Sequence, residues 1–384
     1  MTGFIGVHAG AGDYGDDASS AYKKLCRDAC RKGIEVLKAG GSALEAVAAS
    51  IVIFEECPLT NAGYGSNLTW DGTVECDACV MDGESLTWGG VGAVSGVRNP
   101  IVVAKNLCIR QTDSELLMGR VPPSLLVGEG ARKWAEETGI PTVDPKSLIS
   151  ERSKKVYNHY KRKLAKAQKK SVEFLSPLDT VGAVCIDSKG HVAAASSSGG
   201  IILKHSGRVG QAAMFGCGCW AQDGKDGKHS VATSTSGCGE YLARTLLARE
   251  AGNDLMSSGC GSTCLYGTMV HKFLESPFLT GVPEKLGGVL ALKYEDGGVG
   301  EFLWAHTTTS FCIGYMSCDD TNPRSRMSRL PRGTVPGTKV VVEGVGFKLD
   351  HERLTSQERS PPPSEPDPDV DRDACLRARI LIND

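Results

Sequence analysis

The residues of this sequence most able to do chemistry are an aspartate and a threonine, Asp179-Thr180, at the start of an apolar run. A threonine hydroxyl is a weak nucleophile unless a base removes its proton, and no Ser-His-Asp arrangement is recognisable nearby. If the bond before Thr180 is cut, however, the new α-amino group has a pKa of about 7.7 to 8.0. Thr180 then carries both nucleophile and base, a known variant of the catalytic triad.

Glycine-rich polar segments that could surround Thr180 recur along the chain. Glycine permits tight turns and close backbone approach, as a site of this kind requires. Within one segment Arg208 could hold a carboxylate through two parallel donors, although a surface ion pair is the commoner use of an arginine. The serines could equally serve only the turns. The segments are His8 to Gly12, Asn61 to Ser66, Ser196 to Gly200, Gly207 to Gln211 and Ser234 to Glu240.

These five segments, in this order, resemble the motifs of the N-terminal-nucleophile asparaginase family, and most closely those of its threonine aspartase, or taspase, branch. The resemblance runs from about Phe4 to about Leu349. It implies an α+β fold, a four-layer αββα sandwich with two sheets between helix layers. It also implies one domain over residues 1–350, cut into an α part (1–179) and a β part (180–350) that stay together, without metal or organic cofactor.

The resemblance implies a role for each matching residue. Self-cleavage between Asp179 and Thr180, by an N-to-O acyl shift, frees Thr180 as the nucleophile. Arg208 matches the arginine that holds a substrate carboxylate. Ser198 matches the hydroxyl residue beside the nucleophile, which positions or polarises the Thr180 hydroxyl. Asn61 and Ser236, with the Gly237 backbone N–H, match the donors of the oxyanion hole.

Gln211 departs from the asparaginase pattern. Asparaginases of the family act on free amino acids or isoaspartyl dipeptides, and they carry an Asp three residues after the arginine to hold the substrate's amino group. Glutamine has no charge for an ammonium, which favours a protease that cuts after Asp inside a polypeptide. Leu178-Asp179 offers a model cleavage site, an apolar residue before Asp. The resemblance implies nuclear substrates such as mixed-lineage leukaemia/trithorax proteins and the large subunit of transcription factor IIA.

Other functions remain open on the sequence. The first is an L-asparaginase or isoaspartyl dipeptidase, and the second is an uncleaved nuclear binding protein. A cysteine protease using Cys217, Cys219 or Cys238 lacks a recognisable histidine partner. The C-x-x-C formed by Cys76 and Cys79 has no second ligand pair for zinc.

Composition narrows the class of protein. The charges nearly balance, with 43 Lys and Arg against 45 Asp and Glu, so direct nucleic-acid binding is not expected. We find no apolar run long enough to span a membrane and no signal-peptide layout, and we expect an intracellular protein. The odd count of 15 cysteines favours reduced thiols over a disulfide framework.

Periodicity and turn residues predict helices that cover a mainly antiparallel sheet system. Ser42 and Glu45 form a capping-box pattern at the start of a helix, and Gly89-Gly90 predicts a turn. The expected strands are 4–8, short runs within 73–94, 180–187, 192–196, 288–294, 301–306 and 311–316, and the expected helices are 16–39, 46–56, 100–107, 128–137 and 240–250.

A basic insert, about 146–179, precedes the cleavage site. Between Glu151 and Lys170 it holds nine Lys or Arg and one Glu. The pattern is typical of a solvated helix with one apolar side or of a nuclear import signal around Lys161 to Lys170. The import signal predicts binding to import receptors and a nuclear and cytoplasmic location. The proline-rich tail, 351–384, is expected to be disordered. Related enzymes also suggest a dimer of α/β pairs.

Overall fold

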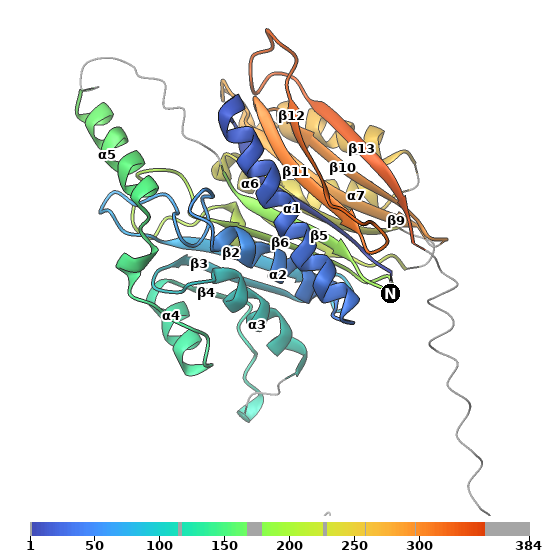
Figure 1. Cartoon of the computed structure of the whole chain (residues 1–384), viewed down its shortest axis with the longest axis horizontal. Coiled ribbons are helices and arrows are strands. Elements are labelled where there is room, and N and C mark those ends of the chain that lie inside the picture. The colour runs from blue at the N-terminus through green and yellow to red at the C-terminus, as the bar shows by residue number, and fades with distance from the viewer. Residues whose placement is uncertain are drawn as a thin grey trace, which may run out of the picture.

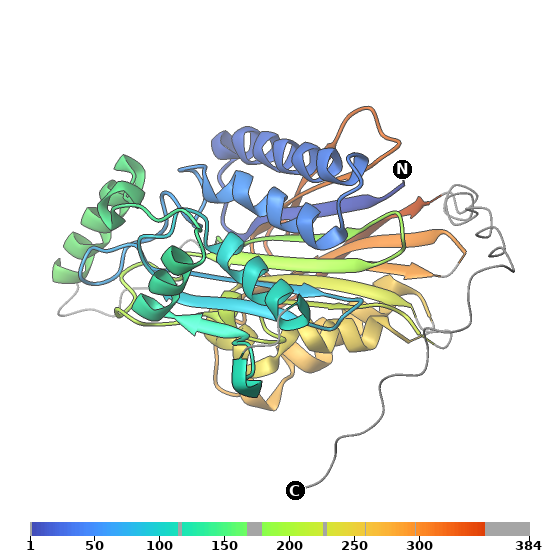
Figure 2. The same ribbon diagram turned by 90° about the horizontal axis from the view of Figure 1, so that it is seen from below.

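Two stacked β-sheets lie between two layers of helices in the computed structural model of the chain (Figures 1 and 2). The structure describes residues 2–113, 117–166, 179–225, 229–257, 259–295 and 297–349. One apolar cluster lies between each sheet and its helices, and a third lies between the sheets. This arrangement confirms the predicted four-layer αββα sandwich.

The first sheet has eight strands, in the order β12-β11-β1-β5-β6-β2-β3-β4. All neighbours are antiparallel except β3 and β4. The order places β1, at the start of the chain, beside β5, which follows Thr180. The strands are β1 (Phe4–Gly12), β2 (Cys76–Asp82), β3 (Trp88–Val94), β4 (Leu125–Val127), β5 (Val181–Ile186), β6 (Val192–Ser198), β11 (Ser310–Ser317) and β12 (Arg324–Arg329).

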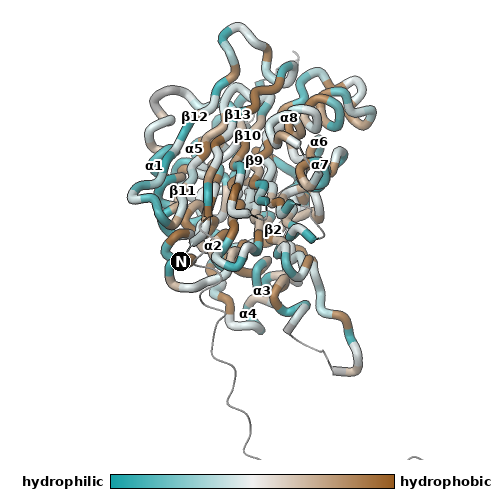
Figure 3. Tube along the Cα trace, turned by 90° about the vertical axis from the view of Figure 1, so that its right-hand side faces the viewer, coloured by the Kyte–Doolittle hydropathy of each residue, from teal (hydrophilic) through white to brown (hydrophobic). Residues whose placement is uncertain are grey.

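The second sheet has five antiparallel strands, in the order β13-β10-β9-β8-β7. They are β7 (Cys219–Gln222), β8 (Ser230–Gly237), β9 (Gly287–Glu295), β10 (Val299–His306) and β13 (Val341–Lys348). Apolar segments coloured brown run through the middle of the molecule in Figure 3. At Gly6 a Cβ atom would lie 2.0 Å from the Phe302 ring, so the two sheets meet there too closely for a larger residue.

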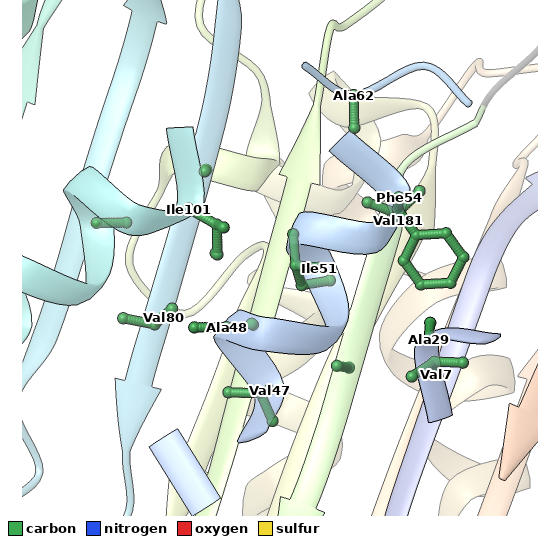
Figure 4. Close-up of a cluster of buried hydrophobic side chains, with 14 of the residues drawn as sticks. Val7, Ala29, Val47, Ala48, Ile51, Phe54, Ala62, Val80, Ile101 and Val181 are labelled. Carbon is green, nitrogen blue, oxygen red and sulfur yellow. The ribbon is translucent and has the colours of Figure 1, made fainter. Parts of the chain in front are cut away.

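Helices α1 (Asp16–Lys38), α2 (Ala43–Glu55), α3 (Pro100–Asp113) and α4 (Gly128–Glu137) cover the outer face of the first sheet. The predicted capping box is confirmed: the Ser42 hydroxyl accepts from the Glu45 N–H, and the Glu45 carboxylate accepts from the Ser42 N–H. Ile51 and Phe54 of α2 lie over the sheet in Figure 4. Helix α2 therefore packs directly on β5, which follows Thr180, and on β6.

Helices α6 (Gly239–Thr245), α7 (Leu247–Leu255) and α8 (Gly261–Gly267) cover the second sheet. The single helix expected over 240–250 was wrong, because Leu246 adopts a left-handed conformation, φ 49°, that divides α6 from α7. Shorter turns are η1 (Leu117–Gly119), η2 (Pro145–Leu148), η3 (Gln211–Ala213), the π-helical η4 (Thr268–Leu274) and η5 (Pro277–Leu279).

Two glycine-rich segments differ from their predictions. Gly89-Gly90 lies inside β3 rather than in a turn. A Cβ at Gly89 would lie 2.0 Å from the Ala104 carbonyl oxygen of α3, so the glycine allows this helix to approach the strand. The strand expected over 4–8 extends through the glycine-rich segment to Gly12 as β1, with a register shift between His8 and Gly10. Glycine serves close packing and a bulge at these places.

The basic segment forms a helix, α5 (Glu151–Lys166), which projects from the body of the molecule in Figure 1. Its apolar side is half-buried, its Lys and Arg are mostly exposed, and Lys161 lies 4.1 Å from the centre of the Trp70 ring. Residues 167–178 and the predicted tail lie outside the described residues. Among the helices that the structure describes, none combines the length and the apolar composition needed to cross a membrane.

Candidate active site

Thr180 lies in a small pocket at one end of the first sheet, where segments from both sheets meet. It is 3% exposed, and β5 begins at the next residue. Seven of the eight residues predicted for the site line this pocket, and three further residues complete the lining. The lining residues are Asn61, Asp179, Thr180, Ser198, Gly200, Ile201, Arg208, Gln211, Gly237 and Gly239.

Two side chains hold the Thr180 hydroxyl group. Thr180 Oγ1 donates to Ser198 Oγ at 3.2 Å and accepts a hydrogen bond from Gln211 Nε2 at 3.0 Å. Ser198 Oγ also accepts from the Gly200 N–H at 3.0 Å. The hydroxyl therefore has a fixed direction, with its proton toward Ser198.

Arg208 reaches the same pocket from the loop that precedes η3. Its Nε and Nη2 atoms lie 2.9 and 2.8 Å from Glu240 Oε1, and its side chain is 14% exposed. A Cβ at Gly200 would lie 2.7 Å from Nη1, so glycine leaves room for this end of the guanidinium. Glu240 thus orients one edge of the Arg208 guanidinium, while Nη1 lies beside Gly200.

A buried aspartate fixes the backbone that carries Arg208 and Gln211. Asp77, in β2, accepts hydrogen bonds from the N–H groups of Gly210 and Ala93, each at 2.8 Å. Burial raises the pKa of Asp77, and nearby Lys204 opposes that shift. Asp77 supports the site without lining the pocket.

The predicted oxyanion-hole residues are only partly brought together. Asn61 and Gly237 line the pocket. Asn61 Nδ2 donates one hydrogen bond, to the Gly200 carbonyl at 2.8 Å, and an amide nitrogen has a second hydrogen to offer. Ser236 is not among the described residues that line the pocket. Its hydroxyl instead accepts from the Ala11 N–H at 2.8 Å, joining β8 to β1.

His8 is a buried core residue. Its Nε2 lies 3.0 Å from Ser234 Oγ, and burial lowers the pKa of His8 to about 3. The ring is therefore neutral at neutral pH. Within the described ranges every cysteine has a free thiol, and no group of three or more His, Cys, Asp or Glu is placed to hold a metal ion.

Glu55 supports the strand that carries Ser198. Glu55 Oε1 accepts from the Ser197 hydroxyl at 2.7 Å and from the Ile101 N–H at 3.1 Å. Burial is the main cause that raises the pKa of Glu55 to about 8. The fully buried carboxyl group is thus protonated at neutral pH.

We expect Glu55→Gln to flatten the dependence of stability on pH between about 4.5 and 8. A raised folded-state pKa favours the native state below the unfolded-state pKa, and this contribution is lost as the pH rises through the folded-state value. The loss is on the order of a few kcal/mol. Urea unfolding at pH 5 and pH 8 measures it, with the exposed neighbour Glu56→Gln as the control. Equal slopes for wild type and Glu55→Gln contradict the assignment.

Comparison with known proteins identifies the family. A sequence profile described as asparaginase matches residues 1–322. The chain belongs to the asparaginase family. The isoaspartyl peptidase/L-asparaginase of Xenopus laevis is 39% identical over 249 residues, which is 65% of this chain and 74% of the relative. That of Mus musculus is 38% identical over 249 residues, 64% of this chain and 70% of the relative.

A bacterial member of the asparaginase family is similarly close. The isoaspartyl peptidase of Salmonella typhimurium is 38% identical over 255 residues, covering 64% of this chain and 76% of the relative. The protein is therefore a hydrolase of the N-terminal-nucleophile asparaginase family, in agreement with its fold. These relatives bear the names of the alternative activity, not that of taspase.

Several residues that shape the site were missed on the sequence. Tyr14 contacts Asp179, Glu240 holds Arg208, and Asp77 anchors the Arg208 loop. Asp77 had a usable signal, since a charged residue inside an otherwise apolar strand needs partners. Glu240 lay inside the predicted segment Ser234 to Glu240, which gave it no role of its own. Tyr14 had no signal, because its partner Asp179 lies 165 positions away in the sequence.

Proposed function

We propose that this protein is a threonine endopeptidase that first cuts itself between Asp179 and Thr180. The observation that carries this proposal is the Thr180 hydroxyl, held by Ser198 and Gln211 beside the scissile Asp179. Thr180 Oγ1 attacks the Asp179 carbonyl carbon, the C–N bond breaks, and an ester and a free amine form. Water then hydrolyses the ester and leaves Thr180 as the new N-terminus.

Turnover in the processed enzyme reuses the same atoms. The free Thr180 amine accepts the hydroxyl proton as the oxygen attacks a substrate carbonyl, and water later releases the acyl group. We assign the substrate aspartate side chain to Arg208, whose guanidinium can hold a carboxylate in two bonds. Asn61 and the Gly237 N–H are the proposed donors to the oxyanion. Ser236 acts indirectly, through its bond to β1.

Gln211 favours a polypeptide substrate over a free amino acid. Its side chain is buried and its amide nitrogen donates to Thr180. A neutral amide offers no charge to a substrate ammonium, whereas an internal Asp of a polypeptide carries a peptide group at that position. The proposed targets are apolar-Asp sites in nuclear regulators, namely mixed-lineage leukaemia/trithorax-type proteins and the transcription factor IIA large subunit.

An isoaspartyl peptidase or L-asparaginase is the second candidate, and the printed names of the relatives favour it. Purified enzyme should be assayed with an apolar-Asp-Gly peptide, asparagine and an isoaspartyl dipeptide. We expect cleavage of the peptide after Asp. Turnover of the small substrates alone would establish the second candidate.

We expect Gln211→Asp to shift activity toward the small substrates. A carboxylate at this place can pair with a substrate ammonium, and we expect kcat/KM for the isoaspartyl dipeptide to rise about tenfold or more, from one charge-assisted contact. Gln211→Asn, with a shorter amide and no charge, is the matched control. Equal kcat/KM for the dipeptide in the two variants would show that charge at position 211 does not set specificity.

An uncleaved nuclear binding protein is the remaining alternative, and intact-mass measurement of the purified chain decides against it if two parts are found. For the processed enzyme we propose a dimer of α/β pairs. We also propose import through the basic segment from Lys161 to Lys170, of which the described part is exposed or half-buried at the end of α5. Transport assays with and without the Lys161-Arg162-Lys163 charges test the import proposal.

A further inference from the structure

Tyr14, between β1 and α1, makes a contact with the scissile aspartate that the chemistry above does not use. Its hydroxyl donates to Asp179 Oδ1 at 2.6 Å, and the hydroxyl oxygen also lies 2.9 Å from the Ala9 carbonyl oxygen. Both Tyr14 and Asp179 are nearly fully buried. A short hydrogen bond to a carboxylate in a dry site is among the stronger polar contacts.

The backbone beside this contact leaves Asp179 little room to move. Gly10 has φ +122°, and a Cβ there would lie 2.3 Å from the Tyr14 hydroxyl oxygen and 2.9 Å from the Asp179 Cα. The end of β1 therefore abuts both residues. Asp179 is held at its side chain by Tyr14 and at its Cα by the packing of Gly10.

Further contacts connect Tyr14 to the basic helix. The Tyr14 and Tyr22 rings meet edge to face, with centroids 4.6 Å apart. Tyr22 OH donates to the Leu59 carbonyl at 2.7 Å, and Arg152 Nη2 lies 3.3 Å from Tyr22 OH. Arg152 belongs to the first turn of α5 and also donates to the Leu59 carbonyl. A continuous set of contacts thus runs from α5 to the cleavage site.

We propose that Tyr14 is a positioning residue for self-cleavage, which fixes the Asp179 carboxylate so that the Asp179 carbonyl carbon faces Thr180 Oγ1. This rests on the proposed cleavage between Asp179 and Thr180. Tyr22 and Arg152 hold Tyr14 in place from α1 and α5. The bond that forms is the Thr180 ester, the bond that breaks is the Asp179–Thr180 amide, and Tyr14 exchanges no proton in either step.

Electrostatics at Asp179 supply a second measurable consequence. Burial raises the pKa of Asp179, and the Tyr14 hydrogen bond and the Arg152 charge both lower it. The charged and titratable groups facing the carboxyl group are Tyr14, Tyr22 and Arg152. Removing the Tyr14 hydroxyl favours the protonated carboxyl group, so any step that needs the carboxylate requires a higher pH.

The test follows the conversion of full-length chain into two parts after cell-free synthesis, by intact mass over time. We expect Tyr14→Phe, which keeps the ring against Tyr22, to slow conversion about tenfold or more. We also expect the acid limb of its rate against pH to move to higher pH. Tyr315→Phe, which removes a hydroxyl from the ring that packs on Phe302 between the sheets, is the matched control.

A second pair of variants keeps the test decisive if Tyr14→Phe does not fold. Arg152 is exposed, and we expect Arg152→Gln to slow conversion severalfold by loosening Tyr22. Arg162→Gln, farther along the same helix, removes a bond to the Asn158 carbonyl, away from Tyr22 and Leu59, and should convert at the wild-type rate.

The outcomes separate the two proposals. A wild-type chain that stays intact overturns the cleavage itself. Wild-type rates and pH dependence in both Tyr14→Phe and Arg152→Gln overturn only the positioning role. Equal slowing by Tyr14→Phe and Tyr315→Phe, without a change in the pH profile, also overturns it, because a general loss of stability would then explain both.

Discussion

Thr180→Ala is expected to abolish self-cleavage and substrate turnover together while the chain remains folded. The variant keeps the Cβ but loses the oxygen held by Ser198 and Gln211. Without that oxygen there is no nucleophile for the Asp179 carbonyl, so no free amine is generated at residue 180. Intact mass should show a single uncleaved chain after long incubation, and no peptide should be cut after Asp.

Thr180→Ser is the matched variant for this experiment. It keeps the hydroxyl and loses the methyl group that restricts χ1, so we expect both reactions to continue more slowly. Denaturant unfolding of Thr180→Ala should show a cooperative transition, since the lost methyl and hydroxyl are small parts of the buried surface. Cleavage of Thr180→Ala, or a new N-terminus at another residue of the wild type, would contradict the assignment of the nucleophile.

Local signals on the sequence were sufficient for much of the fold. Ser42 and Glu45 form their capping box within one helical turn, and the pairing of Val181 with Ser197 follows from a short hairpin. Such features depend on neighbours in the chain and on the period of apolar residues. Gly89 shows where this reasoning ends, because its small size serves the approach of α3, which no nearby residue indicates.

The site was predictable in its chemical groups but not in all its contacts. Thr180, Ser198, Arg208 and Gln211 were found from their motifs, and the structure brings them into one pocket. Tyr14 and Asp179 are 165 positions apart in the sequence, so only the pairing of β1 with β5 makes them neighbours.

Ser236 shows the same limit from the other direction. Its motif suggested an oxyanion donor, but its hydroxyl accepts from the Ala11 N–H across the two sheets. A serine at the end of a strand can face either the pocket or the neighbouring sheet. The choice depends on sheet stacking, which residue spacing alone does not reveal.

Glu240 gives the proposed carboxylate site a resident competitor. It contacts Nε and Nη2 of Arg208 through one oxygen, and its side chain is 49% exposed. Because Glu240 is half exposed to water and uses one oxygen, the solvent weakens its hold, and a substrate carboxylate can compete with it or share the guanidinium. The structure is thus compatible with Arg208 both being held in place by Glu240 and binding the substrate aspartate.

Arg208→Lys is therefore expected to lower kcat/KM for an apolar-Asp-Gly peptide by about 100-fold, and Arg208→Ala by more. Lysine keeps the charge but loses the planar set of donors. One ammonium group therefore cannot bind Glu240 and a substrate carboxylate through separate edges, as a guanidinium can. The same substitution should lower the preference for Asp over Asn before the cleaved bond, measured with paired peptides.

Arg249→Lys, on an exposed part of α7, is the control for a lost guanidinium. Because Arg208 contacts neither Thr180 nor Asp179 through any hydrogen bond that the structure describes, self-cleavage should be reduced far less than turnover. An Arg208→Lys enzyme that still prefers Asp to Asn as strongly as wild type would show that another group recognises the substrate carboxylate.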